Sequence, residues 1–89
     1  MKILFSQDAW EDLQHWLASD EKTLQKILNL LKECQRTPFS GTGKPEPLRN
    51  ELKGWWSRRI SQEHRLVYRV SGANENQTLE VAACRNHYS

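Results

Sequence analysis

The 89-residue sequence predicts an α+β fold in which an N-terminal strand and two helices pack on an antiparallel sheet. Two patterns support this prediction. Up to residue 37, apolar residues recur three or four positions apart, as on one face of a helix, whereas from residue 55 short segments rich in β-branched and aromatic residues alternate with polar turns. Four Trp in so short a chain add apolar area to one small core. We therefore expect residues 1–89 to form a single domain.

The first half of the chain predicts a short strand followed by two helices. Residues 2–5 are the candidate strand, and Ser6 is the expected N-cap of a helix that ends near residue 18. Asp20 is the expected N-cap of the second helix, which Thr37-Pro38 ends because a residue before proline avoids the helical conformation. The apolar stripes comprise Ala9, Trp10, Leu13, Trp16 and Leu17 in the first helix, and Leu24, Ile27, Leu28, Leu31 and Cys34 in the second.

Residues 37–47 hold all three Pro and two of the four Gly, so they predict a loop. Pro45 and Pro47 flank Glu46, and these prolines are expected to hold Lys44 and Glu46 in extended conformations. A carboxylate that loses little entropy on being held in place suits proton transfer. The alternative from the local sequence is an exposed Glu on a rigid turn.

The second half predicts strands that alternate between a buried and an open face. In the middle strand, Leu66 and Tyr68 are expected to face the helices, which leaves Arg65 and Arg69 on the open face. The register of the preceding strand is not determined by spacing, so either Arg58 or Arg59 is expected to join Arg65. The predicted strands of this antiparallel meander are Trp55–Ile60, Arg65–Val70 and Leu79–Arg85.

The formal net charge of +2 conceals an uneven distribution along the chain. Residues 1–33 carry a net charge of −2, whereas residues 44–69 hold seven Lys and Arg against three Glu, a net charge of +4. Such a segment attracts polyanions or an acidic protein segment. With Trp55 or Trp56 nearby to stack on a base, the basic face suits single-stranded RNA. The alternative is a solvated face with the Trp side chains in the core.

Composition also excludes several classes of protein. The N-terminal apolar run, Ile3-Leu4-Phe5, is too short for a signal peptide or a membrane span. We therefore expect a cytoplasmic protein with no membrane partner. Cys34 and Cys84 are far apart and have no CxxC spacing, so they are expected to be reduced core residues.

Three residue types in the second half supply the groups needed for metal-free cleavage of a phosphodiester: the Glu46 carboxylate, the Arg65 guanidinium and the His87 imidazole. His87 lies just past the last predicted strand, where it can reach the open face, although a disordered terminus is the alternative. His15 and His64 are expected to be solvated surface residues. Asn86 has no predicted role.

Five segments of the chain carry a joint pattern: Thr37-Pro38-Phe39, Gly41 with Gly43 to Leu48, Trp56 to Ile60, Glu63 to Tyr68, and Cys84-Arg85 with His87-Tyr88. Taken together and in order, they resemble the YoeB toxins of the RelE superfamily. The resemblance implies the RelE-like microbial RNase fold and a toxin of a type II toxin–antitoxin pair that cuts mRNA in the ribosomal A site.

By this resemblance, Glu46 is the general base for the ribose 2′-OH, His87 the general acid for the departing 5′-oxygen, and Arg65 the group that stabilises the phosphorane. It implies no metal or other cofactor. Its implied partners are mRNA, the ribosome, a cognate acidic antitoxin of the YefM/Phd type and a second copy of the chain. The competing hypothesis is a noncatalytic RelE-like module that binds RNA, the ribosome or an antitoxin. The implied substrate-binding or supporting residues are Arg49, Arg59, Glu63 and Tyr88.

Overall fold

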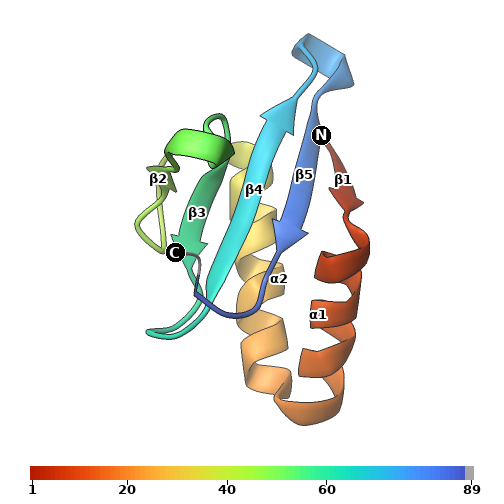
Figure 1. The fold of residues 1–89 in the computed structure, drawn as a ribbon. Coiled ribbons are helices and arrows are strands. Elements are labelled where there is room, and N and C mark those ends of the chain that lie inside the picture. The colour runs from red at the N-terminus through yellow and green to blue at the C-terminus, as the bar shows by residue number, and fades with distance from the viewer. Residues whose placement is uncertain (88–89) are drawn as a thin grey trace.

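The computed structural model, which describes residues 1–87, contains one five-stranded sheet with two helices on one of its faces (Figure 1). Strand β5 lies between β1, which runs parallel to it, and β4, which runs antiparallel. The α+β class is therefore confirmed, but the sheet is mixed rather than wholly antiparallel. The strands are β1 (Lys2–Phe5), β2 (Glu46–Pro47), β3 (Trp56–Arg59), β4 (Arg65–Ser71) and β5 (Thr78–Ala83), in the sheet order β1-β5-β4-β3-β2.

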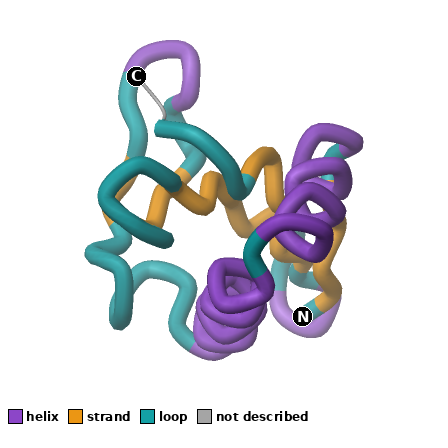
Figure 2. Tube along the Cα trace, turned by 90° about the horizontal axis from the view of Figure 1, so that it is seen from below, coloured by secondary structure: helices purple, strands orange, loops and turns teal. Residues whose placement is uncertain are grey.

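Helices α1 (Gln7–Ser19) and α2 (Glu21–Arg36) begin at the predicted caps. The Ser6 hydroxyl accepts the Ala9 N–H at 3.0 Å, and the Asp20 carboxylate accepts the Thr23 N–H at 3.2 Å. These bonds satisfy amide groups that the first turn of a helix leaves unpaired. Figure 2 shows both helices on the same side of the strands.

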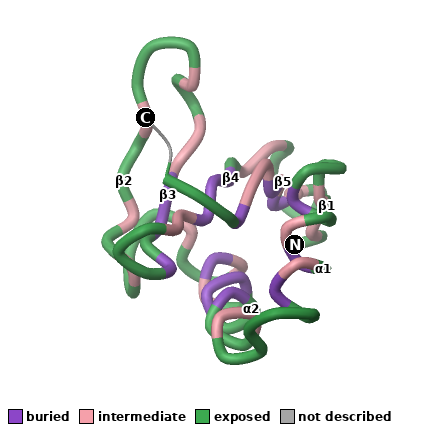
Figure 3. The backbone as a smooth tube through the Cα atoms, turned by 60° about the horizontal axis from the view of Figure 1, so that its bottom comes forward, coloured by how far each residue is buried: buried purple, intermediate pink, exposed green. Residues whose placement is uncertain are grey.

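The core lies between the helices and the sheet, where the buried positions of both layers face each other (Figure 3). Helix α2 contributes Ile27, Leu30, Leu31 and Cys34, so the inclusion of Leu28 in its buried stripe was wrong: Leu28 is 38% exposed. Trp10 and Leu17 of α1 are likewise exposed. A helix buries only the arc that contacts the sheet, and these side chains lie outside it.

The predicted loop 37–47 contains the short edge strand β2, which pairs with β3. Glu46 is extended, as expected, but Lys44 is not: its φ is +50°, next to Gly43 at +88°. This left-handed turn is held by the Arg59 N–H, which donates to the Gly43 carbonyl at 2.7 Å. The turn directs the chain back along β3, so that Glu46 joins the sheet.

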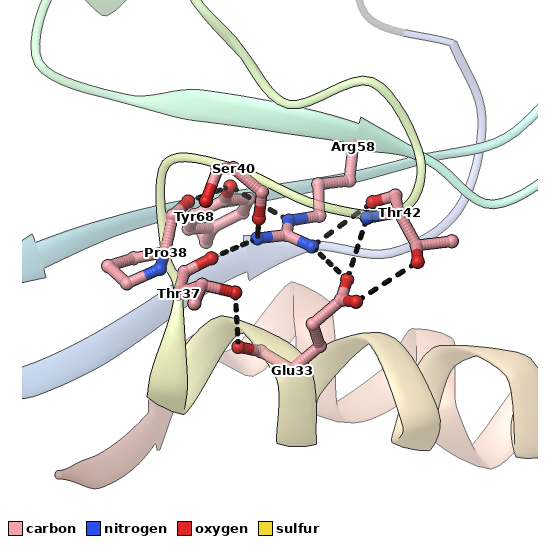
Figure 4. Close-up of polar contacts among 7 residues, drawn as sticks. All are labelled: Glu33, Thr37, Pro38, Ser40, Thr42, Arg58 and Tyr68. Carbon is pink, nitrogen blue, oxygen red and sulfur yellow. Dashed lines mark hydrogen bonds and ion pairs between the residues drawn. The ribbon is translucent and has the colours of Figure 1, made fainter.

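Arg58 holds the same loop from inside the protein (Figure 4). Its side chain is fully buried, and its five N–H groups have five acceptors. The acceptors are the Tyr68 hydroxyl, the Glu33 carboxylate and the backbone carbonyls of Thr37, Ser40 and Thr42.

The partners of Arg58 are themselves fixed. Glu33 also accepts the Thr42 N–H at 2.9 Å and the Thr42 hydroxyl at 3.0 Å, and Tyr68 donates to the Pro38 carbonyl. Desolvation opposes ionisation of Glu33, but the Thr42 hydrogen bonds and the charge of Arg58 outweigh it and lower the pKa of Glu33 below 4.5. Burial raises the pKa of Tyr68 to about 12. The loop that leads to Glu46 is therefore anchored to both α2 and β4.

The two cysteines agree with the prediction from the sequence. Cys34 and Cys84 are buried free thiols, as predicted. Among residues 1–87, no helix has the length and apolar character needed to cross a bilayer.

Strand β5 ends at Ala83, two residues earlier than predicted, because the chain then leaves the sheet and crosses the end of β4 (Figure 1). The remaining short elements are the 3₁₀ turns η1 (Asn50–Leu52) and η2 (Asn74–Asn76).

Candidate active site

Strand register places three of the predicted site residues on the open face of the sheet, opposite the helices. Glu46 pairs with Ser57 of β3, and Ser57 pairs with Val67 of β4. Two positions further along the same strands, Arg59 pairs directly with Arg65. Cross-strand partners project to the same face, and so do residues two apart in one strand. Glu46, Arg59 and Arg65 therefore share one face of adjacent strands.

This register decides between the two candidate arginines. Arg59 is exposed on the open face, whereas Arg58 points to the core and belongs to the loop anchor described above. It also separates the two tryptophans: Trp56 packs against the core and lies 4.7 Å from the Phe39 ring, while Trp55 lies under the Arg69 guanidinium at 4.5 Å. Trp55 is the aromatic residue that the open face offers.

The Arg65 side chain is held by the backbone of the β3–β4 turn. One terminal nitrogen, Nη1, donates to the carbonyls of Ser61, Gln62 and His64 at 2.6, 3.2 and 3.0 Å. Glu63 is exposed in the same turn, and within the described part of the chain it forms no ion pair with an arginine. Carbonyl groups, rather than a carboxylate, therefore orient Arg65 and leave its positive charge unneutralised.

Contacts from α1 and from the β3–β4 turn hold the segment that leads to His87. The Cys84 N–H donates to the Asp12 carboxylate at 3.0 Å, and its carbonyl accepts the Trp16 indole N–H at 2.9 Å. Two residues later, the Asn86 carbonyl accepts the Arg65 N–H at 3.0 Å. The chain is thus led from β5 across the end of β4, and exposed His87 follows directly on a residue bonded to Arg65 (Figure 1).

An open cleft of about 750 Å³ lies at the end of the sheet where the β3–β4 turn leaves it, and four cationic side chains line it. Arg59 and Arg65 belong to the sheet, Lys44 to the loop before β2, and Lys26 to α2. Within residues 1–87, the ion-paired Lys and Arg side chains are Arg58 and Arg69, so these four are free to bind anions. The cleft is suited to a chain of phosphates.

The structure brings Glu46, Arg59, Arg65 and the approach to His87 together at one end of the sheet. Arg49 is exposed in the turn after β2, and Tyr88 lies outside the described residues. Sequence reasoning missed Lys26, which looks like any other charge on a solvated helix face. It also missed Asn86, whose φ of +68° is a left-handed conformation that Asn adopts more readily than most residues. The tolerance of Asn for the left-handed conformation was the signal in the sequence that could have identified this turn.

Comparison with known proteins agrees with this class of fold. The structure is similar to a YoeB/ParE toxin from Agrobacterium tumefaciens, with a TM-score of 0.97 and 49% identity over 99% of this chain and 100% of that one. Residues 5–88 match the family described as YoeB-like toxins of bacterial type II toxin–antitoxin systems. The chain belongs to this family.

Other relatives cover nearly the whole chain. Toxin RelK of Mycobacterium tuberculosis is 57% identical over 86 residues, which are 97% of this chain and 96% of the relative. A YoeB dimer from Staphylococcus aureus has a TM-score of 0.86 at 42% identity, covering 99% of this chain and 98% of that one. A heterotetrameric YoeB–YefM complex from the same organism has a TM-score of 0.85 at 43% identity, with the same coverage of both chains.

Proposed function

We propose that this toxin is a cytoplasmic, metal-independent endoribonuclease that cuts mRNA in the ribosomal A site and thereby inhibits translation. The observation that carries the proposal is the shared face of Glu46, Arg59 and Arg65, beside which the chain delivers His87. A carboxylate, two guanidinium groups and an imidazole are a base, an electrostatic clamp and an acid. A surface that only bound RNA would need the arginines and would have no use for the other two groups.

In the proposed reaction, the Glu46 carboxylate takes the proton of the ribose 2′-OH, and the 2′-oxygen attacks the adjacent phosphorus. The bond from phosphorus to the 5′-oxygen breaks, and the His87 imidazolium donates a proton to that departing oxygen. Arg65 stabilises the charge that develops on the phosphorane oxygens, because its guanidinium is held in place before substrate arrives. The products are a 2′,3′-cyclic phosphate and a free 5′-hydroxyl.

The remaining predicted contacts concern binding. We assign Arg59 to a phosphate next to the scissile bond, because it lies beside Arg65 and faces the cleft. Arg49, Glu63 and Tyr88 keep the supporting roles that the family resemblance implies. Trp55 offers a ring for a base, although Arg69 already stacks on it.

We also propose that the toxin is neutralised by an acidic antitoxin of the YefM/Phd type and that it forms homodimers. The net charge of +4 over residues 44–69 is complementary to an acidic segment that covers the open face. The complex and the dimer of the Staphylococcus aureus relatives support both partners.

The test is primer extension on mRNA in programmed bacterial ribosomes, with the intact protein, Glu46→Gln and His87→Gln in parallel. Glu51→Gln in η1 and His15→Gln in α1 are matched controls, since they make the same changes at residues with no proposed role in cleavage. We expect a cut within the A-site codon that each catalytic substitution slows about 10²- to 10⁴-fold. Ribosome binding without a cut by the intact protein would instead establish the noncatalytic module.

A further inference from the structure

The rings of His15 and His64 both contact Trp16, and they differ in whether the ring makes a hydrogen bond. The centroid of the His15 ring lies 4.9 Å from that of the Trp16 ring, and the centroid of the His64 ring lies 4.7 Å from it, both in T-shaped geometry. The His64 Nδ1 accepts the Asn86 N–H at 2.8 Å, whereas the His15 imidazole makes no hydrogen bond within residues 1–87. His64 therefore links α1 to the segment that ends in His87.

The Asn86 backbone is bonded on both sides. Its N–H donates to the His64 side chain, and its carbonyl accepts the N–H of Arg65. Arg65 is the residue that follows His64 in the chain. Its left-handed φ of +68° turns the chain at this point. A residue with both backbone groups bonded and a fixed turn sets the direction in which the following residue leaves the sheet. That residue is His87.

The ring of His64 is itself prevented from rotating. Trp16 packs on it edge to face, and the Trp16 N–H is used by the Cys84 carbonyl of the same C-terminal segment. Because Nδ1 accepts a hydrogen bond, the neutral ring carries its proton on Nε2. Trp16 thus contacts both the C-terminal segment, at the Cys84 carbonyl, and His64, which bonds to Asn86 of that segment.

We propose that His64 is a positioning residue that places the His87 imidazole by holding the Asn86 amide. This inference rests on the proposed catalytic role of His87. His64 itself does not line the basic cleft, so its loss is expected to change the rate of cleavage and not the affinity for RNA or ribosomes. A misplaced general acid should slow the cleavage step by about 10- to 100-fold.

Two substitutions separate the hydrogen bond from the packing. His64→Phe keeps an aromatic edge against Trp16 and removes the acceptor, whereas His64→Asn keeps an oxygen near the Nδ1 position and removes the ring. We expect His64→Asn to cleave within about threefold of the intact protein and His64→Phe to show the full loss. His15→Phe and His15→Asn are the matched controls, and both should leave cleavage unchanged. The opposite order, or equal rates for the two His64 variants, would overturn the proposal.

Two readouts exclude a merely structural effect. Hydrogen exchange of the Asn86 amide, followed by NMR, should be faster in His64→Phe and unchanged in His64→Asn, while thermal unfolding checks that both are folded. In a His87→Gln background, His64→Phe should have no further effect on the residual rate, because there is no acid left to misplace. Multiplying effects would refute the coupling. If the intact protein does not cut RNA at all, the proposed function fails, whereas amide exchange still decides whether His64 anchors the segment.

Discussion

Replacing Arg58 by Met removes a buried charge from the centre of the loop anchor and leaves its partners in place. The Arg58 side chain has no exposed surface, and its five N–H groups bond to one carboxylate, one hydroxyl and three carbonyls. Arg58 is the buried member of the pair, and the Glu33 side chain is 26% exposed. Removing a buried charge from such a network destabilises a protein by about 3–5 kcal/mol, because the hydroxyl and carbonyl groups left behind are desolvated and unpaired. We expect Arg58→Met to lower the free energy of unfolding by this amount.

The loss is large for a protein of this size. A domain of 89 residues has a total stability of roughly 4–13 kcal/mol, and each kcal/mol shifts its midpoint of thermal unfolding by about 4–8 °C. Arg58→Met should therefore lower the midpoint by at least about 12 °C. Arg58→Lys should recover little of it, because an ammonium group cannot match the planar, five-donor geometry of a guanidinium.

Urea unfolding followed by tryptophan fluorescence measures the free energy of unfolding, and a thermal scan measures the midpoint. Arg69→Met is the matched control. Arg69 is also ion-paired, to Glu80 at 3.1 Å, but its side chain is 44% exposed. Exposed pairs contribute at most about 1 kcal/mol. Equal losses in Arg58→Met and Arg69→Met would refute the reasoning, since burial is the difference on which it rests.

Three further predictions follow from other features. Lys26→Gln should weaken binding of a short, uncleavable single-stranded RNA and reduce the slope of log Kd against log salt by about 0.7, the value for one phosphate contact. Lys22→Gln on the same helix should change neither quantity. Fluorescence anisotropy measures the affinity and its salt dependence. Burial raises the pKa of Cys84 from 9.0 to about 12, so above pH 9 the unfolded chain loses a proton that the folded chain keeps. The contribution of Cys84 to stability should fall by about 1.4 kcal/mol per pH unit up to pH 12, in addition to the loss from Tyr68, whose pKa is also raised. Urea midpoints against pH should show that Cys84→Ala flattens this fall, and an unchanged slope would disprove the assignment. Gly43→Ala places a Cβ 3.0 Å from the Arg59 carbonyl oxygen, whereas at Gly54, which also has a positive φ, a Cβ meets nothing within 4 Å. Calorimetry should therefore show a larger loss of stability for Gly43→Ala than for Gly54→Ala, and primer extension a larger loss of cleavage.

Short-range signals predicted the helices correctly and the edge of the sheet incorrectly. Ser6 and Asp20 cap their helices through bonds to amides three residues away, so the cause and the signal lie in one stretch of sequence. Strand β2 was missed because its two residues pair with β3, about ten residues further on, and because two prolines disguise it as loop. The exposure of Leu28 was missed because helical spacing does not reveal how wide an arc the sheet covers.

The candidate site shows the same division. Composition and family resemblance together named Glu46, Arg59, Arg65 and His87, since the chemistry of each residue is a property of its side chain alone. The convergence of Glu46, Arg59 and Arg65 on one face followed only from the register of β2, β3 and β4, and the burial of Arg58 beside exposed Arg59 is a consequence of the same register. The Lys26 cleft and the His64 bond to Asn86 join residues from separate elements.

The sequence by itself determined the helices, the three main strands, the basic middle segment and the family. Only the tertiary structure decided which arginine lies on the open face, what holds the loop before Glu46 and what leads the chain to His87. The physical reason is the distance along the chain over which each interaction acts. Capping, periodicity and turn preferences act within a few residues, whereas strand pairing and buried hydrogen bonds join groups that come together only when the core has formed.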